Sequence, residues 1–288
     1  MDVTIRPATE ADAEECGRIC YEAFKAIAER HDFRPDFPTL DSAVGLIRAL
    51  ASSPDVFGVV AEAGGRVVGS NFLWEYDRIR AVGPITVDRE AQAAGVGRRL
   101  MRAVVERGRG AEGVRLVQDS FNTASLSLYA SLGFDVKEPL AVVEGEPAGE
   151  LPEGYEVRTL RAEDLAACAD LCRGVHGFER TNELKHTPPF LTSFVALRGG
   201  RLTAYASAPH SWVLNHAVAE TEEDMRALLT GASNQGRGTP LSFLLPTRQS
   251  ELFRWCLSKG MRVVKPMTLM ALGPYEEPRG SFLPSVGY

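Results

Sequence analysis

The sequence predicts an α/β protein, in the broad sense that includes α+β folds, with two similar domains. Three observations predict this class. Helix-like and strand-like segments alternate along the first half of the chain, a segment near the N-terminus recurs after residue 156, and a linker-like stretch separates the two copies. A chain of 288 residues is also long enough for two domains of ordinary size. We therefore expect helices on the faces of a sheet in each copy.

Hydrophobic periodicity predicts the elements of the first copy in order. A strand over 3–6 leads into a helix over 10–29 and a second helix over 41–51. Strands over 57–63, 66–75 and 80–88 come next. The copy ends with a helix over 95–108, a strand over 114–120, a helix over 123–132, and a strand that begins at Phe134.

The repeat is recognised from three matches that occur in the same order. Residues 5–20 align without gaps with residues 157–172, so that Arg6 matches Arg158 and Asp12 matches Asp164. Two shorter matches follow: Gly64-Gly65-Arg66 with Gly199-Gly200-Arg201, and Leu132-Gly133-Phe134-Asp135-Val136 with Lys259-Gly260-Met261-Arg262-Val263. Each match is short, so chance similarity is the alternative. We interpret the three together as a duplication.

Between the copies, residues 144–154 contain two prolines, several glycines and repeated glutamates. This composition is typical of an exposed linker. We place the boundary there and expect one domain over 1–148 and a second over 149–288.

Composition and charge exclude several classes of protein. The net charge of -6 disfavours a dedicated nucleic-acid binder, and no window holds the roughly 20 apolar residues of a membrane span. The N-terminus has no signal-peptide pattern. The cysteine pairs Cys16/Cys20 and Cys168/Cys172 are read as small buried hydrophobes, not as metal ligands or disulfides. We expect a cytoplasmic protein with no metal and no membrane or nucleic-acid partner.

The segment after the strand that ends at Val87 carries the clearest functional signal. A short loop leads to a helix that opens at Gly95-Val96-Gly97, although glycine is a poor helix former. One explanation is that bare backbone amides at the helix N-terminus approach an anion such as pyrophosphate. The other is that the glycines allow close packing of helix and strand. The spacing fits neither the dinucleotide fingerprint nor the P-loop.

A second motif follows downstream, from Asn122 to Phe134. Each of its residues has an ordinary structural explanation. Asn122 can cap the next helix, Tyr129 can be a half-buried aromatic on the apolar face, and Gly133 can end the helix.

Together, Gln92-x-x-Gly95-x-Gly97 and Asn122-x-x-Ser125-x-x-Leu128-Tyr129-x-x-x-Gly133-Phe134 resemble the GNAT acyltransferase superfamily. Ser125 replaces the usual alanine, a small-for-small change. Ile5–Asp12 also resembles the first strand and turn of that superfamily, so the resemblance covers residues 1–144. It implies two GNAT-like domains, each with a mixed, mostly antiparallel sheet flanked by helices.

The resemblance implies N-acetyl transfer from acetyl-CoA, the co-substrate, to a primary amine of a small molecule or protein, by direct attack in a ternary complex. Tyr129 would protonate the departing thiolate. The backbone of Ile85, Thr86 and Val87 would pair with the pantetheine arm, and one of their N–H groups would polarise the thioester carbonyl. The backbone amides of the loop would hold the pyrophosphate: Gln92, Ala93, Ala94, Gly95, Val96, Gly97 and Arg98. Asn122 is the last of the expected cofactor-binding residues.

The base that deprotonates the amine is less defined. Glu75, Asp77, Asp119 and His31 are candidates, and we prefer Glu75, although each is also interpretable as an ordinary surface charge.

The acceptor would bind at the loop over 31–38, which is rich in proline and aromatic residues. His31, Phe33 and Phe37 are the candidates there. The alternative is that the two phenylalanines hold the loop on the core.

The second copy lacks the glycine motif. Glu220–Asp224 crowds carboxylates where a pyrophosphate would bind, and Cys256 occupies the position of Tyr129. Asn234–Gly238 imitates the motif but is expected in a loop after a helix that ends near Thr230. The polar-aromatic segment 173–180 is expected at a solvated helix end, and the alternative is that it faces a ligand. We therefore expect a degenerate second domain.

Two other functions stay open. One is a non-catalytic acyl-CoA sensor or assembly module, and the other is a mycothiol-synthase-like acetyltransferase, whose active motif would be expected in the second copy. The protein is expected to be a monomer or homodimer.

Overall fold

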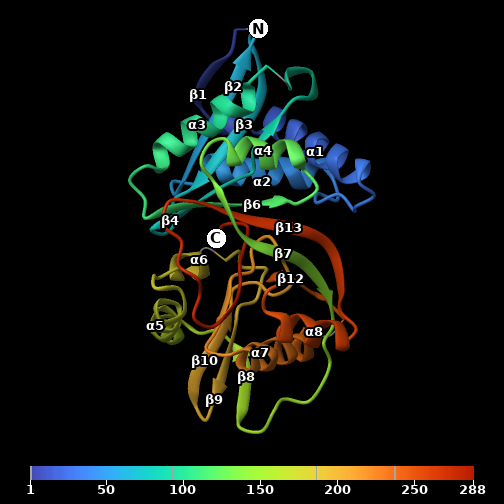
Figure 1. The fold of residues 1–288 in the computed structure, drawn as a ribbon, viewed down its shortest axis with the longest axis vertical. Helices are drawn as coiled ribbons and strands as arrows, with labels where there is room; N and C mark the ends of the chain where they lie inside the picture. Colours follow the sequence, from blue (N-terminus) through green and yellow to red (C-terminus); the bar gives the residue numbers. More distant parts are fainter. Residues whose placement is uncertain (1, 93, 186, 237) are drawn as a thin grey trace. The chain divides into compact units, whose positions relative to one another are not determined.

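The computed structural model describes residues 2–92, 94–185, 187–236 and 238–288, and the chain divides into two compact units (Figure 1). Unit 1 consists of Met1–Leu116, Phe121–Asp135 and Ala271–Gly273, and unit 2 consists of Val117–Ser120, Val136–Met270 and Pro274–Tyr288. The expected boundary after residue 148 lies between strands β7 (Asp135–Gly145) and β8 (Tyr155–Thr159). It stays a prediction, while the contacts of β7 group it with unit 2.

The strands of unit 1 are neighbours in the sheet in nearly the same order as along the chain. Neighbouring strands run in the order β1-β2-β3-β4-β6, with β5 paired to β3. The pairs are antiparallel except for β4 and β6, which run parallel. The strands are β1 (Thr4–Pro7), β2 (Val56–Ala63), β3 (Arg66–Trp74), β4 (Ile79–Val82), β5 (Thr86–Val87) and β6 (Gly113–Asp119), of which the last residues of β6 belong to unit 2.

The expected strand over 80–88 is two strands, β4 and β5, because the cis-linked Gly83-Pro84 interrupts it. Proline has no N–H to donate to a ladder, so pairing stops there. Before the break, Ile79–Ala81 pair with Gly113–Arg115 of β6, whereas after it Thr86 and Val87 pair with Ser70 and Gly69 of β3. Among the described residues, the other edge of β5 has no strand partner.

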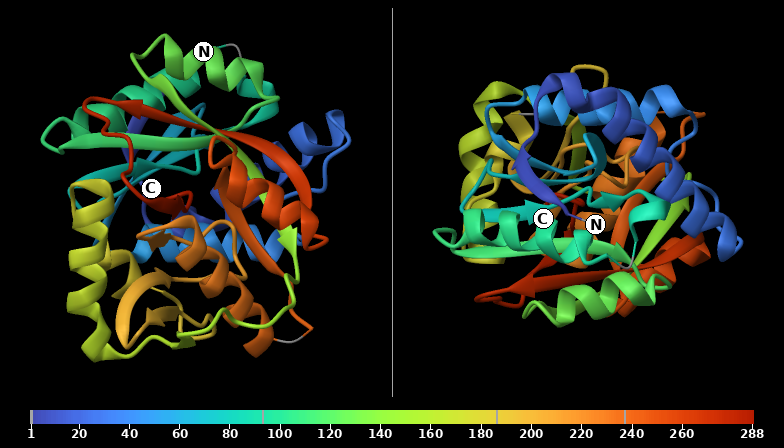
Figure 2. Two further views of the ribbon diagram at one scale, coloured as in Figure 1. Left: turned by 60° about the horizontal axis from the view of Figure 1, so that its bottom comes forward. Right: turned by 90° about the horizontal axis from the view of Figure 1, so that it is seen from above.

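Four α-helices accompany these strands in the described part of unit 1: α1 (Ala13–Arg30), α2 (Leu40–Ser52), α3 (Val96–Gly108) and α4 (Thr123–Ala130). Figures 1 and 2 show α1 and α2 side by side. Gly17 of α1 makes this possible, because a Cβ there would lie 2.5 Å from the Cα of Val44 in α2. The close pair positions the loop between the two helices.

The duplicated segment forms the same local structure twice. Arg6 donates to both carboxylate oxygens of Asp12 at 2.8 and 2.7 Å, and Arg158 donates to those of Asp164 at 2.7 and 2.8 Å. In each copy a single turn of 3-10 helix, Glu10–Asp12 or Ala162–Asp164, leads into a helix. In both copies, the same arginine–aspartate ion pair therefore fixes the turn between strand and helix.

Unit 2 contains a five-stranded sheet in the order β14-β11-β10-β9-β8. Helices α5 (Leu165–His176) and α7 (Glu222–Gln235) pack on opposite faces of it (Figure 1). Side-chain alternation explains this, because Tyr205 and Val218 pack with α5 while Ala204 and Ala217 pack with α7. Besides β8, this sheet consists of β9 (Phe194–Arg198), β10 (Arg201–Ala206), β11 (Ala217–Ala219) and β14 (Ser281–Leu283).

The remaining strands of unit 2 include β12 (Leu241–Pro246), which pairs antiparallel with β7, and β13 (Arg262–Leu272), whose last two residues belong to unit 1. Helices α6 (Thr181–Lys185) and α8 (Ser250–Ser258) complete the unit. Across both units, none of the helices described has the length and apolarity to span a lipid bilayer.

Candidate active site

Three elements of unit 1 meet at Gly97, in the first turn of α3. A Cβ at Gly97 would lie 3.5 Å from Leu128 of α4 and 3.8 Å from Val87 at the end of β5. The two sequence motifs, although about 30 residues apart in the chain, are therefore neighbours in space.

The N-terminus of α3 has no side-chain cap. Its N-cap is Gly95, whose φ of 74° is left-handed and favours glycine, and which has no side chain to accept from the first-turn amides. Those amides form the positive end of the helix dipole. An exposed, uncapped helix start of this kind suits an anion.

The loop before α3 is held by side-chain contacts. Gln92 donates from Nε2 to the carbonyl oxygen of Val87 at 3.3 Å, and Arg98 donates to the hydroxyl of Ser131, the C-cap of α4, at 2.8 Å. Ala94 is exposed and Val96 is buried beneath the helix start. Ala93, which the sequence assigned to the same loop, lies outside the described residues.

Strand β5 borders this loop. Ile85 and Val87 are half-buried, and Thr86 is buried. Because β3 is the one strand that pairs with β5 in the described part of the chain, the second backbone edge of β5 is available to an extended ligand.

Asn122 and Tyr129 define the two ends of α4. The side chain of Asn122 accepts from the amide of Ser125 at 3.2 Å. Asn122 therefore caps the N-terminus of α4, as its structural explanation predicted. Tyr129 is buried, with 6% of its surface exposed, and packs edge-on against Phe134 with ring centroids 6.4 Å apart. Its neighbour Leu128 faces Gly97 in the first turn of α3.

The loop between α1 and α2 brings two of its three candidate residues together. Phe33 stacks on Phe121 with centroids 4.4 Å apart, and His31 lies tilted on the same ring at 5.1 Å. Phe37 instead packs on Phe24 of α1 at 5.5 Å, as its packing alternative predicted. Sequence reasoning missed Phe121, although an aromatic residue directly before Asn122, at the end of a strand, was an available signal.

Glu75 does not join this group. It follows β3, whose Ser70 pairs with Thr86, and at about 3.3 Å per residue the strand separates Glu75 from that pair by about 16 Å. Its carboxylate forms ion pairs with Arg80 at 2.6 Å and Arg107 at 2.9 Å, and it raises the pKa of Arg107. The assignment of Glu75 as base stays a prediction.

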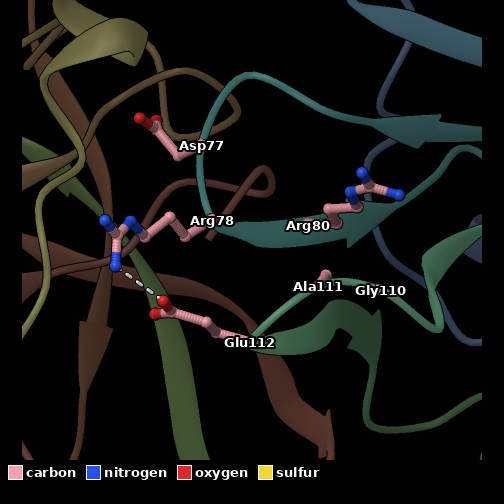
Figure 3. A pocket seen from close by; sticks show the side chains of 6 residues that line it. All are labelled: Asp77, Arg78, Arg80, Gly110, Ala111 and Glu112. Atoms are coloured by element: carbon pink, nitrogen blue, oxygen red, sulfur yellow. Dashed lines mark hydrogen bonds and ion pairs between the residues drawn. The ribbon is translucent and has the colours of Figure 1, made fainter.

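The other proposed carboxylate bases have different surroundings. Asp119, in unit 2, forms a buried ion pair of 2.7 Å with Lys265. Asp77 lines a shallow polar pocket beside an ion pair of 2.8 Å between Arg78 and Glu112 (Figure 3). Arg80, Gly110 and Ala111 complete the lining of this pocket, which contains none of the residues assigned to acetyl-CoA.

In the second copy, the helix start that corresponds to α3 is capped and acidic. Thr221 accepts from the amide of Asp224 at 3.2 Å, and Asp224 is fully buried. Glu220 forms ion pairs with Arg198 and Arg201. The amides that would bind an anion are thus already satisfied or faced by carboxylates.

Two details of the second copy differ from expectation. Helix α7 extends to Gln235, so Asn234 and Gln235 lie in its last turn and not in a loop, because the apolar stripe continues through Ala232. The segment 173–180 is not solvated throughout, because His176 and Arg180 are each only 2% exposed. Burial also raises the pKa of Cys256, at the position of Tyr129, to about 12.

A polar cluster in unit 2 was not expected from the sequence, which predicted no metal ligands. Potential ligand atoms of Cys172, His176 and His216 all lie within 4.8 Å of one another, and the three residues are buried. The available signal was that His176 follows Cys172 by one helical turn. Burial lowers the pKa of His216 well below its ordinary value, with Arg180 and His176 adding to the effect, so its imidazole is uncharged.

Comparison with known proteins identifies the family. Residues 22–134 match the model of the acetyltransferase (GNAT) family. The N-alpha-acetyltransferase RimI of Mycobacterium tuberculosis (strain ATCC 25618 / H37Rv) is 35% identical over 140 residues, which cover 46% of this chain and 78% of that protein.

Solved structures extend the similarity of fold over nearly the whole chain. A protein from Pyrococcus horikoshii has a TM-score of 0.75 and 18% identity, with 97% of this chain and 94% of that chain covered. A tandem GNAT protein from the clavulanic acid biosynthesis pathway has a TM-score of 0.60 and 15% identity, with 96% and 100% covered. The expected fold class, with helices flanking its sheets, is confirmed. The chain belongs to the acetyltransferase (GNAT) family of enzymes.

Proposed function

We propose that this protein transfers the acetyl group of acetyl-CoA to a primary amine, with unit 1 as the active unit. The observation that carries the proposal is the meeting of the uncapped start of α3, the free edge of β5 and the Tyr129 helix around Gly97. A pyrophosphate, an extended thiol arm and a proton donor would each find a suitable partner there.

Each part of acetyl-CoA would have its own binding element. The amides of Gly95 to Arg98 would bind the pyrophosphate, with no side chain at Gly95 or Gly97 to obstruct it. The open backbone edge of Ile85–Val87 would pair with the amides of the pantetheine arm, as an added strand does. Gln92 would support this arrangement, because its side chain fixes the carbonyl of Val87.

The reaction would proceed by direct attack. A backbone N–H of β5 would donate to the thioester carbonyl oxygen, where negative charge develops. The amine nitrogen forms a bond to the carbonyl carbon, the carbon–sulfur bond breaks, and Tyr129 gives its hydroxyl proton to the departing thiolate. The nitrogen loses a proton to solvent or to a nearby base, and the products are an amide and free CoA.

An N-terminal α-amine is the acceptor we would test first. The α-amino group has a pKa of about 7.7–8.0, so about a third is neutral at pH 7.5, against roughly 0.1% of a lysine side chain. Such an acceptor requires little help from a base, which accords with the ion pairs that occupy Glu75 and Asp119. The activity in the name of the 35% identical relative also supports this choice.

The first experiment is calorimetric titration of acetyl-CoA into the wild type and into Gly97→Glu, with Gly45→Glu as control. Gly97 has room for a Cβ, so the variant should fold while its carboxylate repels the pyrophosphate. Gly45 is an exposed helical glycine of α2 with nothing within 4 Å of a Cβ. Binding should be lost in Gly97→Glu only, and equal binding in all three would refute the assignment of the loop.

The second experiment identifies the acceptor. Release of CoA thiol is measured with peptides that carry a free N-terminus, the same peptides with a blocked N-terminus and an internal lysine, and small polyamines. Acetylation confined to free N-termini would support the α-amine. Binding of acetyl-CoA without transfer to any amine would instead support the acyl-CoA sensor.

A further inference from the structure

The buried cluster of Cys172, His176 and His216 lies apart from the acetyl-CoA residues and belongs wholly to unit 2. Cys172 and His176 occupy one face of α5, one turn apart. His216 comes directly before β11, and its backbone is fixed to Ser207 by two hydrogen bonds, of 2.7 and 3.0 Å. Strand alternation puts His216 on the same face as Val218, which packs against α5.

Both histidines have one ring nitrogen bonded to a tyrosine hydroxyl. The hydroxyl of Tyr205 is 3.0 Å from Nε2 of His216, and that of Tyr288 is 3.2 Å from Nδ1 of His176. Nδ1 of His216 is fully buried and has no hydrogen-bond partner among the described residues. In metal sites, a hydrogen bond of this kind on one nitrogen fixes the tautomer and presents the other nitrogen to the ion.

We propose that Cys172, His176 and His216 bind a single zinc ion in unit 2. Thiolate and imidazole are the ligands that Zn²⁺ prefers. The hydroxyl of Tyr205, which also hydrogen-bonds to Cys172, would support two of the ligands from outside the coordination shell, and a water molecule would be the fourth ligand.

Binding requires the loss of one proton and a small movement. The thiol of Cys172 loses its proton to solvent when its sulfur bonds to zinc, so one proton is released per ion. With Zn–N bonds of about 2.0–2.1 Å and a Zn–S bond of about 2.3 Å, tetrahedral ligand atoms stand about 3.3–3.6 Å apart. The ligand atoms, which lie within 4.8 Å of one another, must therefore close by up to about 1 Å.

The charge around the cluster permits a divalent ion. Arg180 is the nearby cation, but Glu183 neutralises it through an ion pair of 2.7 Å, and the carbonyl of Gly287 accepts from the same guanidinium at 2.6 Å. Zn²⁺ together with the Cys172 thiolate adds a net charge of +1 to the site. The neighbouring cation, Arg180, is already paired with Glu183. The bound ion would tie α5 to β11 on one face of the five-stranded sheet.

The test measures metal content in untagged protein equilibrated with zinc and then dialysed. Wild type should retain one zinc per chain, and Cys172→Ser should retain less than a tenth of that. Cys168→Ser is the matched control, because Cys168 is equally buried one turn earlier on α5 but is outside the cluster. Tyr205→Phe removes only the supporting hydroxyl and should weaken zinc affinity by about 10–100-fold.

Cobalt substitution gives a second readout that does not depend on the folding of Cys172→Ser. Co²⁺ bound to wild type and to Cys168→Ser should give the thiolate-to-cobalt charge-transfer band, and zinc should raise the Tm of both. A wild type that holds no zinc, or binds cobalt without this band, would overturn the proposal. Preferential retention of copper over zinc would overturn the choice of ion.

Discussion

At the scale of single residues, Asp12 shows how the repeated turn responds to pH. Arg6 is the main cause that lowers the pKa of Asp12 from 3.8 to about 2, and the amide and hydroxyl of Thr9 contribute. A carboxylate whose pKa is lowered in the folded state stabilises that state above its unfolded pKa, and this stabilisation is lost as pH falls through the folded pKa.

Asp12→Asn should therefore reduce the free energy of unfolding by about 1–2 kcal/mol at pH 7, because Arg6 is partly exposed and solvent screens the pair. The difference from wild type should shrink as pH falls from about 4 towards 2. Urea midpoints across this range test it, with the exposed Asp2→Asn as control. A difference that does not change with pH would contradict the role of the ionised pair.

Tyr129→Phe removes the proposed proton donor and keeps the ring that packs on Phe134. We expect kcat to fall about 100-fold, at the low end for a general acid, because CoA thiolate is a good leaving group. KM for acetyl-CoA should change little. Steady-state thiol release measures both, with the half-buried Tyr21→Phe of α1 as control, and an unchanged kcat would exclude Tyr129 as the acid.

The sequence predicted well the residues whose structural role depends on neighbours close in sequence. The pair Gly95 and Gly97 lies at a helix start as expected, and Asn122 caps its helix. Sequence reasoning missed Phe121 and His216, because their neighbours come from distant segments, and spacing along the chain does not encode such contacts.

At the scale of elements, the α1–α2 pair depends on Gly17. Gly17→Ala should destabilise the protein by about 1–3 kcal/mol, since a Cβ would collide with the backbone of Val44. Gly45→Ala, in open space on α2, should instead stabilise it by up to about 1 kcal/mol. Urea denaturation of the two variants measures both signs, and a neutral Gly17→Ala would show that the helices can separate without cost.

Most element positions in the first copy were predictable from hydrophobic periodicity, as α2, β2 and β3 illustrate, with ends within a residue of expectation. The strand over 80–88 was not, although Pro84 was visible in the sequence. Its apolar run continues across the proline, so periodicity alone could not show that β4 and β5 have different partners.

At the scale of the whole molecule, the two helix starts predict how many acetyl-CoA molecules bind. The start of α3 is bare, whereas that of α7 is capped by Thr221 and lined with carboxylates. Calorimetry should therefore give one acetyl-CoA per chain. Two sites would show that the second copy is not degenerate.

The duplication was predictable because its matches keep their order, and the paired Arg6–Asp12 and Arg158–Asp164 bear it out. The composition of the units was not predictable. A linker rich in glycine and proline indicates where the chain is exposed. It does not indicate which unit β7 joins, because β7 pairs with β12, about a hundred residues later in the chain.

The composition of the units also has a consequence for synthesis on the ribosome. Unit 1 includes Ala271–Gly273, so its last segment emerges only after most of unit 2 has been translated. At roughly 5–20 residues per second, the interval after residue 135 is on the order of ten seconds. The nascent N-terminal half must persist incomplete for that time, until residues 271–273 have been translated.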